Sequence, residues 1–419
     1  MLKKDPKAKD GVRAPQPGEI MKNPTLAQTF RSLAAEGKKG FYQGRVAEEL
    51  VKVVQDLGGY MTLDDLKYHA DTGSQEVDAV ALKFTGQDIE AKQSAGTDGE
   101  KPNQGVYVWE HPPNGQGIVA LMALGILEEL ERVGKIPTFA EDQLNSAEYL
   151  HAVIESLRIA FADAAWWVTD PDTAGSDIPS PGQLLSRDYL AKRAELFDPL
   201  RAAEPLDHGS PSVFSKSDTV YLAVTDRSGN GISFINSNYG GFGTAIIPRG
   251  CGFTLQNRGA NFALSPPSHP NILAPRKRPY HTIIPAMITN VADNTLHSVY
   301  GVMGGFMQPQ GHVQVLLNML AFKNHPQAAL DAPRFCIGAG SGSDSEKGRN
   351  QRPIVFVEEG ISDEAVAGLR GLGHRIQVLK GFDRAMFGRG QVIRAHYDDG
   401  ILVYSAGSDL RGDGMAIPL

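Results

Sequence analysis

The hydrophobic pattern of this chain changes character near residue 219. Before that point, apolar residues recur at three- and four-residue spacing, which predicts helices. Beyond it, short β-rich runs alternate with turn residues. A helical first half and a strand-rich second half predict an α+β fold of two stacked sheets covered by helices on their outer faces. The expected helices are 24–37, 46–57, 118–133, 146–163, 311–322 and 363–372.

Strands are expected on both sides of residue 219, together with one more helix and two segments without regular structure. Thr62 should cap a short helix in the first half. Residues 85–105 are polar and lack periodicity, so a surface insertion or a linker is expected there. Residues 202–216 have no regular pattern and lead to Asp218. The expected strands are 77–84, 106–110, 220–225, 232–236, 283–289, 297–303, 354–358, 375–379, 392–397 and 401–405.

Charge, hydropathy and cysteine content limit the partners and the cellular location that we expect. The net charge of −7 arises from 41 basic and 48 acidic side chains without a basic stripe, which argues against a nucleic-acid partner. No stretch approaches the roughly 20 apolar residues of a membrane span, and no signal peptide follows Met1, so a cytoplasmic location without a membrane partner is expected. Cys251 and Cys336 suggest buried small side chains rather than a disulfide framework.

Metals and cofactors are not expected from the sequence. No glycine loop of the phosphate-binding kind precedes a helix in the required way. Five histidines outside the motifs described below show no metal-ligand spacing. They are His69, His151, His208, His269 and His374.

Thr219 opens one of the strands directly after Asp218. A hydroxyl needs a base to take its proton, and the α-amino group of the same residue provides one once the preceding peptide bond is cut. The unperturbed pKa of such an amine is about 8, so part of it is deprotonated at neutral pH. Asp218-Thr219 is therefore a candidate self-cleavage point, although a threonine that begins a strand can equally be an ordinary strand former.

A series of ordered motifs after Thr219 resembles the γ-glutamyltransferase (γ-glutamyltranspeptidase) family. The resemblance extends from about Pro24 to the C-terminus. The motifs are the turn Gly229-Asn230, the strand 231–238, the glycine-rich 240–243, and the segments 255–259, 278–282, 301–305, 308–312, 331–335, 387–391 and 408–414.

This resemblance implies the four-layer αββα sandwich of the N-terminal-nucleophile hydrolases. Residues 1–218 would form a mostly helical, large-subunit-like part, and 219–419 a strand-rich, small-subunit-like catalytic part. The two fragments would remain associated as one interlocked unit. Family members typically carry a further N-terminal region with an arginine that binds the glutamyl carboxylate, and no residue before Pro24 matches it.

The resemblance also assigns catalytic roles. Thr219 would be both nucleophile and base. Gly304 and Gly305 would present backbone N–H groups to the oxyanion, which a glycine pair allows because no Cβ intervenes. Ser237 lies where the family keeps a second hydroxyl that orients the nucleophile. Its neighbour Tyr239, together with Asn236 and Asn238, would line the pocket.

Substrate recognition departs from the family pattern. Where relatives place an acid and a pair of serines, this chain has Asn261 and His281-Thr282. An asparagine cannot match the charge of an ammonium group. Arg258 adds a planar cation suited to a carboxylate, although a structural salt bridge is an equal alternative.

The predicted function is that of an autoprocessing enzyme that cleaves or transfers an acyl group from a small-molecule amide through an acyl-threonine intermediate. The donor would be a γ-glutamyl compound such as glutathione, with water or an amine as acceptor and no cofactor. One alternative is an amidohydrolase that takes a carboxylate-bearing acyl group and has no transferase activity. The other is an uncleaved, noncatalytic relative.

Overall fold

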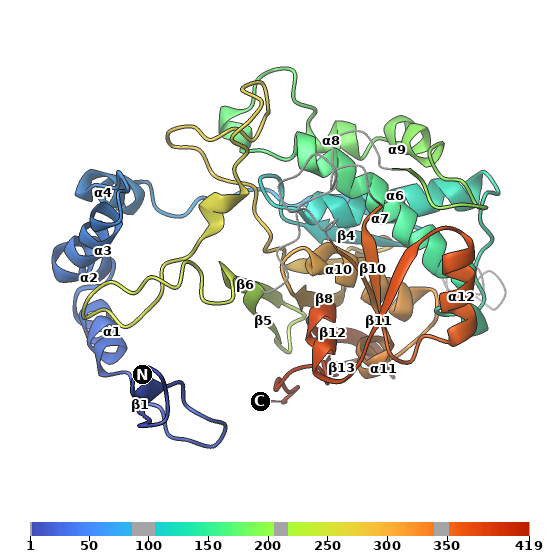
Figure 1. The fold of residues 1–419 in the computed structure, drawn as a ribbon. Coiled ribbons are helices and arrows are strands. Elements are labelled where there is room, and N and C mark those ends of the chain that lie inside the picture. Colours follow the sequence, from blue (N-terminus) through green and yellow to red (C-terminus); the bar gives the residue numbers. More distant parts are fainter. Residues whose placement is uncertain (1, 86–104, 205–216, 339–351, 419) are drawn as a thin grey trace. The chain divides into compact units, whose positions relative to one another are not determined.

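The computed structural model describes residues 2–85, 105–204, 217–338 and 352–418 (Figure 1). The chain forms two compact units. The first consists of Met1–Glu76 with Phe242–Asn257, and the second of Val77–Gly241 with Arg258–Leu419. The predicted insertion at 85–105 and the segment 202–216 lie almost wholly outside the described residues, as does His208.

The smaller unit is built from helices. Amphipathic α3 and α4 bury a small core of Ala47, Leu50, Val51 and Leu66. Thr62 is the N-cap residue of α4, as predicted, and its backbone N–H donates to the Asp65 carboxylate at 2.7 Å, which is the reciprocal bond of a capping box. The helices are α1 (Pro24–Glu36), α2 (Lys39–Tyr42), α3 (Gly44–Asp56) and α4 (Leu63–Thr72), after a short pair of strands β1 (Lys3–Lys4) and β2 (Val12–Arg13).

A six-stranded sheet organises the larger unit. Its strand order is β13-β12-β8-β7-β4-β3, and each neighbouring pair is antiparallel. Two strands precede residue 219 and four follow it, so one sheet joins the two halves of the sequence. The strands are β3 (Val80–Phe84), β4 (Val106–Glu110), β7 (Ala286–Asn290), β8 (Leu296–Met303), β12 (Arg389–Asp398) and β13 (Ile401–Ser408).

Three apolar helices cover one face of this sheet: α6 (Gly117–Arg132), α7 (Ala147–Trp167) and α10 (Met307–Leu320). Helix α6 packs on β3, β4 and α7, whereas α10 packs on β8 and α6. Nearly every side chain of α6 and α10 is buried, which matches helices that are apolar around most of their circumference.

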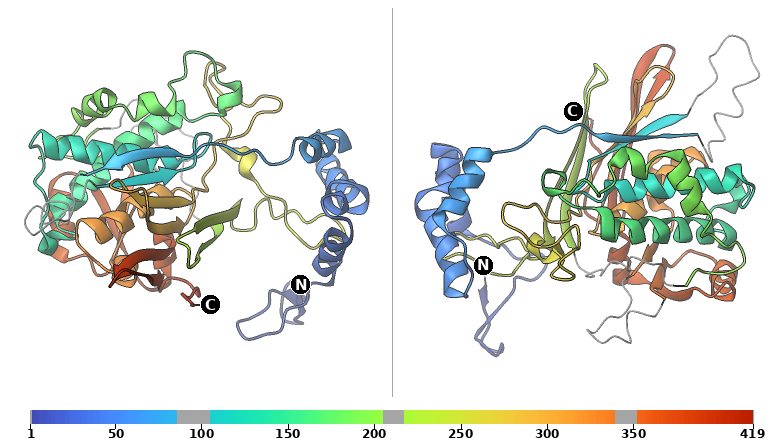
Figure 2. Two further views of the ribbon diagram at one scale, coloured as in Figure 1. Left: turned by 180° about the vertical axis from the view of Figure 1, so that it is seen from behind. Right: turned by 90° about the horizontal axis from the view of Figure 1, so that it is seen from above.

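A separate hairpin, β5 (Ser217–Thr225) with β6 (Gly231–Gly240), packs on the other face of β8 (Figures 1 and 2). Successive residues of a strand point to opposite faces. Val302 of β8 faces Gly311 of α10, whereas a Cβ at Gly301 would lie 2.5 Å from the Tyr221 ring of β5. Helices, sheet and hairpin therefore form three successive layers.

The remaining elements complete the larger unit. A third sheet, in the order β11-β10-β9, has α12 beside β11. Among the described helices, none is long and apolar enough to cross a membrane. These elements are α8 (Pro181–Leu184), α9 (Arg187–Ala194), α11 (Pro326–Asp331), β9 (Phe335–Ile337), β10 (Ile354–Glu358), α12 (Asp363–Gly371) and β11 (Arg375–Leu379).

The mixed helix and sheet class predicted from the sequence is confirmed. The strands at 106–110, 354–358 and 375–379 have the predicted bounds, and most other predicted elements differ by a few residues at their ends. The expected strand 283–289 begins only at Ala286, because 283–285 have no ladder partner. The sequence did not predict α2, α8, α9, α11 or β9, all of which are short.

Candidate active site

Thr219 lies in β5 with its side chain buried. Its partner across the hairpin is Ser237, and the strand register shifts between Asp218 and Thr219. The two hydroxyls are within hydrogen-bonding distance, with Thr219 Oγ1 3.4 Å from Ser237 Oγ. The predicted cleavage point therefore coincides with an irregularity in an otherwise regular ladder.

Ser237 is itself held in place by its neighbours in β6. Its Oγ accepts a hydrogen bond from the Tyr239 backbone N–H at 2.8 Å, and its own N–H donates to Asn236 Oδ1 at 2.8 Å. A hydroxyl oxygen has two acceptor lone pairs, so Ser237 Oγ also accepts from the Thr219 hydroxyl. Ser237 can thus serve as the acceptor that orients the Thr219 hydroxyl.

Arg258 contacts two of the other predicted substrate-binding residues, Tyr239 and Thr282. It lies in a short 3-10 helix and is only 5% exposed. Its guanidinium carbon is 5.2 Å from the centre of the Tyr239 ring, and its Nη1 donates to Thr282 Oγ1 at 2.7 Å. Tyr239, near the end of β6, adopts a φ of +75°, in the left-handed region of backbone conformation. Burial lowers the pKa of Arg258 to about 10, opposed by Tyr239.

Asn261 and His281 lie beside this cluster but bond to the backbone. Asn261 Nδ2 donates to the Tyr280 carbonyl at 3.0 Å. His281 Nδ1 accepts from the Ile283 N–H at 3.2 Å, so the ring is in the tautomer with its proton on Nε2. Burial, then the positive charge of Arg258, lowers the pKa of His281 to about 3, and the ring is neutral near pH 7.

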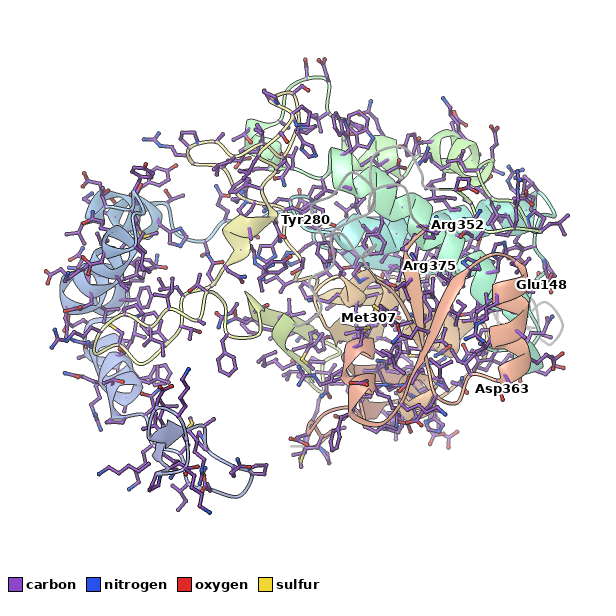
Figure 3. The ribbon with its side chains drawn as sticks, in the orientation of Figure 1. Glu148, Tyr280, Met307, Arg352, Asp363 and Arg375 are labelled. Carbon is purple, nitrogen blue, oxygen red and sulfur yellow. The ribbon has the colours of Figure 1, made fainter. Side chains whose placement is uncertain are left out.

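The glycine pair follows β8 directly and leads into α10. Gly304 has a φ of +132° and Gly305 a φ of +60°, conformations that favour glycine. Their carbonyls accept from the Met307 and Gln308 N–H groups, so the loop closes onto the start of α10 (Met307 is labelled in Figure 3). Within the described residues, the N–H groups of Gly304 and Gly305 make no hydrogen bond to the protein. They are therefore available as oxyanion donors.

A small apolar cluster brings the nucleophile strand to this loop. Tyr221, two residues after Thr219, packs with Ile235 and with Met303, the residue before Gly304. Thr219, Ser237 and the glycine loop thus belong to neighbouring parts of β5, β6 and β8.

Gln116 connects the glycine loop to the Arg258 cluster. It was not among the predicted site residues, yet its buried side chain donates to both the Thr282 and the Gly305 carbonyls. These partners are 166 and 189 residues away in sequence. No local pattern marks such a residue, because its role depends on carbonyls from distant segments.

The spacing of histidines in the sequence did not predict one cluster that contains two of them. His151, Glu155 and His374 lie close together and buried. His151 Nε2 donates to the Asp198 carbonyl, so its Nδ1 accepts from His374 Nε2 at 2.8 Å. Glu155 is paired with Arg158. These contacts already use most of the atoms that a metal would need.

An open depression of about 760 Å³ lies elsewhere in the larger unit. It is lined by residues of β3, α6, α9 and adjoining loops, and by none of the predicted site residues.

The fold matches that of the N-terminal-nucleophile hydrolases. The crystal structure of a cephalosporin acylase from Bacillus halodurans superimposes with a TM-score of 0.76 at 36% identity, covering 96% of this chain and 64% of that one. The chain belongs to the gamma-glutamyltranspeptidase family, whose model matches residues 7–419. The family resemblance drawn from the motifs is therefore confirmed.

Two curated relatives are similar over nearly all of this chain. A glutathione hydrolase-like YwrD proenzyme from Bacillus subtilis is 34% identical, covering 97% of this chain and 67% of that protein. An oxamate amidohydrolase proenzyme from Klebsiella pneumoniae is 32% identical, covering 96% of this chain and 66% of that protein. The chain thus spans about two thirds of the length of these relatives.

Proposed function

We propose that this chain is the catalytic part of a self-processing amidohydrolase that uses Thr219 as its nucleophile. The observation that carries the proposal is the position of Thr219 at the ladder irregularity, buried, beside Ser237 and next to the end of β8. The chemistry needs a nucleophile, a base and oxyanion donors, and this part of the larger unit offers all three.

Self-cleavage would precede catalysis. Thr219 Oγ1 attacks the Asp218 carbonyl carbon, the peptide C–N bond breaks as the hydroxyl proton passes to the Thr219 nitrogen, and an ester joins the two residues. Water then hydrolyses the ester to give a carboxylate on Asp218 and the free hydroxyl of Thr219, whose α-amino group has already been released. The six-stranded sheet takes strands from both sides of this bond, so the two fragments would stay associated.

Turnover would repeat this chemistry on a small amide. The Thr219 amine takes the hydroxyl proton as Oγ1 attacks the substrate carbonyl, and the Gly304 and Gly305 N–H groups stabilise the oxyanion. The amine product leaves with that proton, and water hydrolyses the acyl-threonine ester. An amine in place of water would make the reaction a transfer.

The acyl group would carry a carboxylate and need no α-amino group. Arg258 supplies a buried cation held by Thr282, and Asn261 supplies no negative charge for an ammonium. Oxamate, the named substrate of one relative, is an amide with a carboxylate and no amine on its acyl group. A γ-glutamyl donor such as glutathione is the second candidate, because the other relative is described as glutathione hydrolase-like.

We also propose that the complete fold is a four-layer αββα sandwich. On the outer face of β5–β6 the side chains of Val220, Leu222, Val224, Ile232 and Phe234 are all at least 43% exposed. Apolar side chains gathered on one sheet face normally pack against another layer. A helical layer over this hairpin would be the fourth layer.

Intact mass of the purified chain tests the mechanism. We expect two fragments that meet between Asp218 and Thr219, and a single uncleaved, inactive chain for Thr219→Ala. Thr225→Ala, at the far end of the same strand, is the matched control and should cleave normally. A wild-type chain that stays whole would favour the noncatalytic alternative.

Substrate choice is tested with two chromogenic amides. We expect glutaryl anilide to be hydrolysed faster than γ-glutamyl anilide, because only the latter carries an ammonium group. Faster hydrolysis of the γ-glutamyl compound would contradict the role given to Arg258 and Asn261.

A further inference from the structure

Gln116 makes three side-chain hydrogen bonds in a fully buried position directly before α6. Its Nε2 donates to the Thr282 and Gly305 carbonyl oxygens, both at 2.8 Å. Its Oε1 accepts from the Tyr280 hydroxyl at 3.2 Å. Since both partners of Nε2 are carbonyls and burial raises the pKa of Tyr280, one orientation of the amide satisfies all three contacts.

The two carbonyls belong to different functional segments. Thr282 is the residue whose hydroxyl holds Arg258, at 2.7 Å. Gly305 is half of the glycine pair, which has no side chain to restrain it. Tyr280, labelled in Figure 3, also packs its ring 5.9 Å from that of Phe306, the residue after the pair.

The backbone of Gln116 adds to this connection. Its N–H donates to the His281 carbonyl at 3.0 Å, and the His281 N–H donates to the Asn114 carbonyl at 2.9 Å. The turn before α6 is therefore bonded to segment 280–282 through main chain and side chain. The Gln116 side chain extends the connection to the Gly305 carbonyl, and the Ile284 N–H adds a second link to the start of α10 by donating to Gln308 Oε1 at 3.1 Å.

We propose that Gln116 is a positioning residue that fixes the distance between Arg258 and the oxyanion loop, and so selects the length of the acyl chain. A substrate whose carboxylate binds Arg258 must place its scissile carbonyl at the glycine pair. A rigid connection between those two points admits one chain length best. The proposal rests on the function proposed above.

A series of monoanilides of dicarboxylic acids, from oxalyl to glutaryl, measures this selection. In the wild type we expect one length to be preferred by about tenfold in kcat/KM over its neighbours, which is typical for one methylene. Gln116→Leu removes both N–H groups that hold the two segments, so the profile should flatten to within about threefold while kcat falls by about a hundredfold through misplacement of the oxyanion loop.

Gln314→Leu is the matched control. Gln314 is also buried, and its Nε2 donates to the Gln310 and Phe335 carbonyls at 2.9 and 3.1 Å, away from the predicted site. Gln314→Leu should lower the free energy of unfolding about as much as Gln116→Leu does. It should keep the wild-type dependence of kcat/KM on acyl-chain length. A preserved profile in Gln116→Leu, or equal flattening in both variants, would overturn the proposal.

Gln116→Glu provides a second variant in case Gln116→Leu does not fold. A carboxylate facing two carbonyls repels both, whereas its protonated form donates to one of them. Length discrimination in this variant should therefore be several-fold stronger at pH 5 than at pH 8, and in the wild type it should not change. A variant profile that is the same at both pH values would contradict the proposal.

Hydrogen exchange separates this proposal from the proposed function. Residues 278–284 and 303–310 should both exchange faster in Gln116→Leu than in Gln314→Leu. If the wild type hydrolyses no anilide and stays uncleaved, the proposed function fails, and the selectivity role of Gln116 fails with it. Unchanged exchange in either segment would refute the physical connection itself.

Discussion

Arg258 illustrates how a single residue can define a site. A guanidinium that is 5% exposed loses most of its hydration, and here it gains a hydroxyl from Thr282 and the face of Tyr239. A carboxylate ligand would add charge-assisted hydrogen bonds to this buried guanidinium. The planar fork is what makes arginine suited to that contact.

Replacement of Arg258 by lysine tests this role. A lysine keeps the charge and loses the two-bond geometry, so we expect KM for a carboxylate-bearing amide to rise about tenfold, equivalent to roughly 1.4 kcal/mol. The change in kcat should be smaller. Steady-state kinetics with glutaryl anilide measure both constants.

Arg334→Lys is the control for loss of a buried arginine. Arg334 is also fully buried, but it pairs with Asp409 at 2.7 Å. Its replacement should lower stability and leave KM unchanged. If the two variants raise KM equally, Arg258 does not bind the substrate carboxylate.

At the scale of elements, Gly301 determines how closely the nucleophile hairpin approaches the sheet. A Cβ there would lie 2.5 Å from the Tyr221 ring, and the neighbouring strand residue Val302 faces α10. The missing side chain therefore allows β5 to pack directly on β8. Thr219 lies two residues along the same strand from Tyr221.

Gly301→Ala should displace the hairpin. We expect the free energy of unfolding to fall by about 1–3 kcal/mol through overpacking, and self-cleavage to slow. Gly371→Ala in α12 is a control, because a Cβ there meets no atom within 4 Å. Urea titration and timed mass spectra report the two effects, and normal cleavage with normal stability would contradict this packing argument.

Elements with strong periodicity were predictable from the sequence. The apolar runs of α6 and α7 and the alternation of β10 and β11 are local properties, so their positions follow from residue spacing. Strand β9 has three residues, all buried, and is stabilised by its ladder with β10. A segment that short carries too little pattern to be recognised.

At the scale of the whole molecule, the larger unit combines strands from both sides of the predicted cleavage point in one sheet. It also buries several histidines. Burial is the main cause that lowers the pKa of both His297 and His374 to about 3. Both rings are therefore mainly neutral in the folded state from about pH 4 upward.

The free energy of unfolding should fall in acid, because the fold buries His297 and His374 as neutral rings. In the unfolded chain a histidine protonates below pH about 6.5, while these two stay neutral in the fold down to about pH 3. The unfolded state thus binds more protons between these values, and each group should lower the free energy of unfolding by about 1.4 kcal/mol per pH unit as pH falls.

Tryptophan fluorescence can measure this effect, since Trp109, Trp166 and Trp167 all lie in the larger unit. We expect the free energy of unfolding to depend less steeply on pH between pH 4 and 6 in His297→Gln than in the wild type. The difference in slope should correspond to about one proton. Between pH 7 and 8 the two histidines should contribute no slope. An unchanged acid slope in the variant would contradict the neutral, buried state of His297.

Residue periodicity and ordered motifs are local properties, and they were enough to predict the α+β class, the family and the catalytic candidates without a structure. The roles of Thr219, Ser237 and the glycine pair remain predictions, now with a geometry that can be tested. The contacts of Gln116 and the packing of Tyr221 on Gly301 became visible in the folded chain. Both depend on atoms brought together from distant segments, and the position of a residue in the chain carries no record of such contacts.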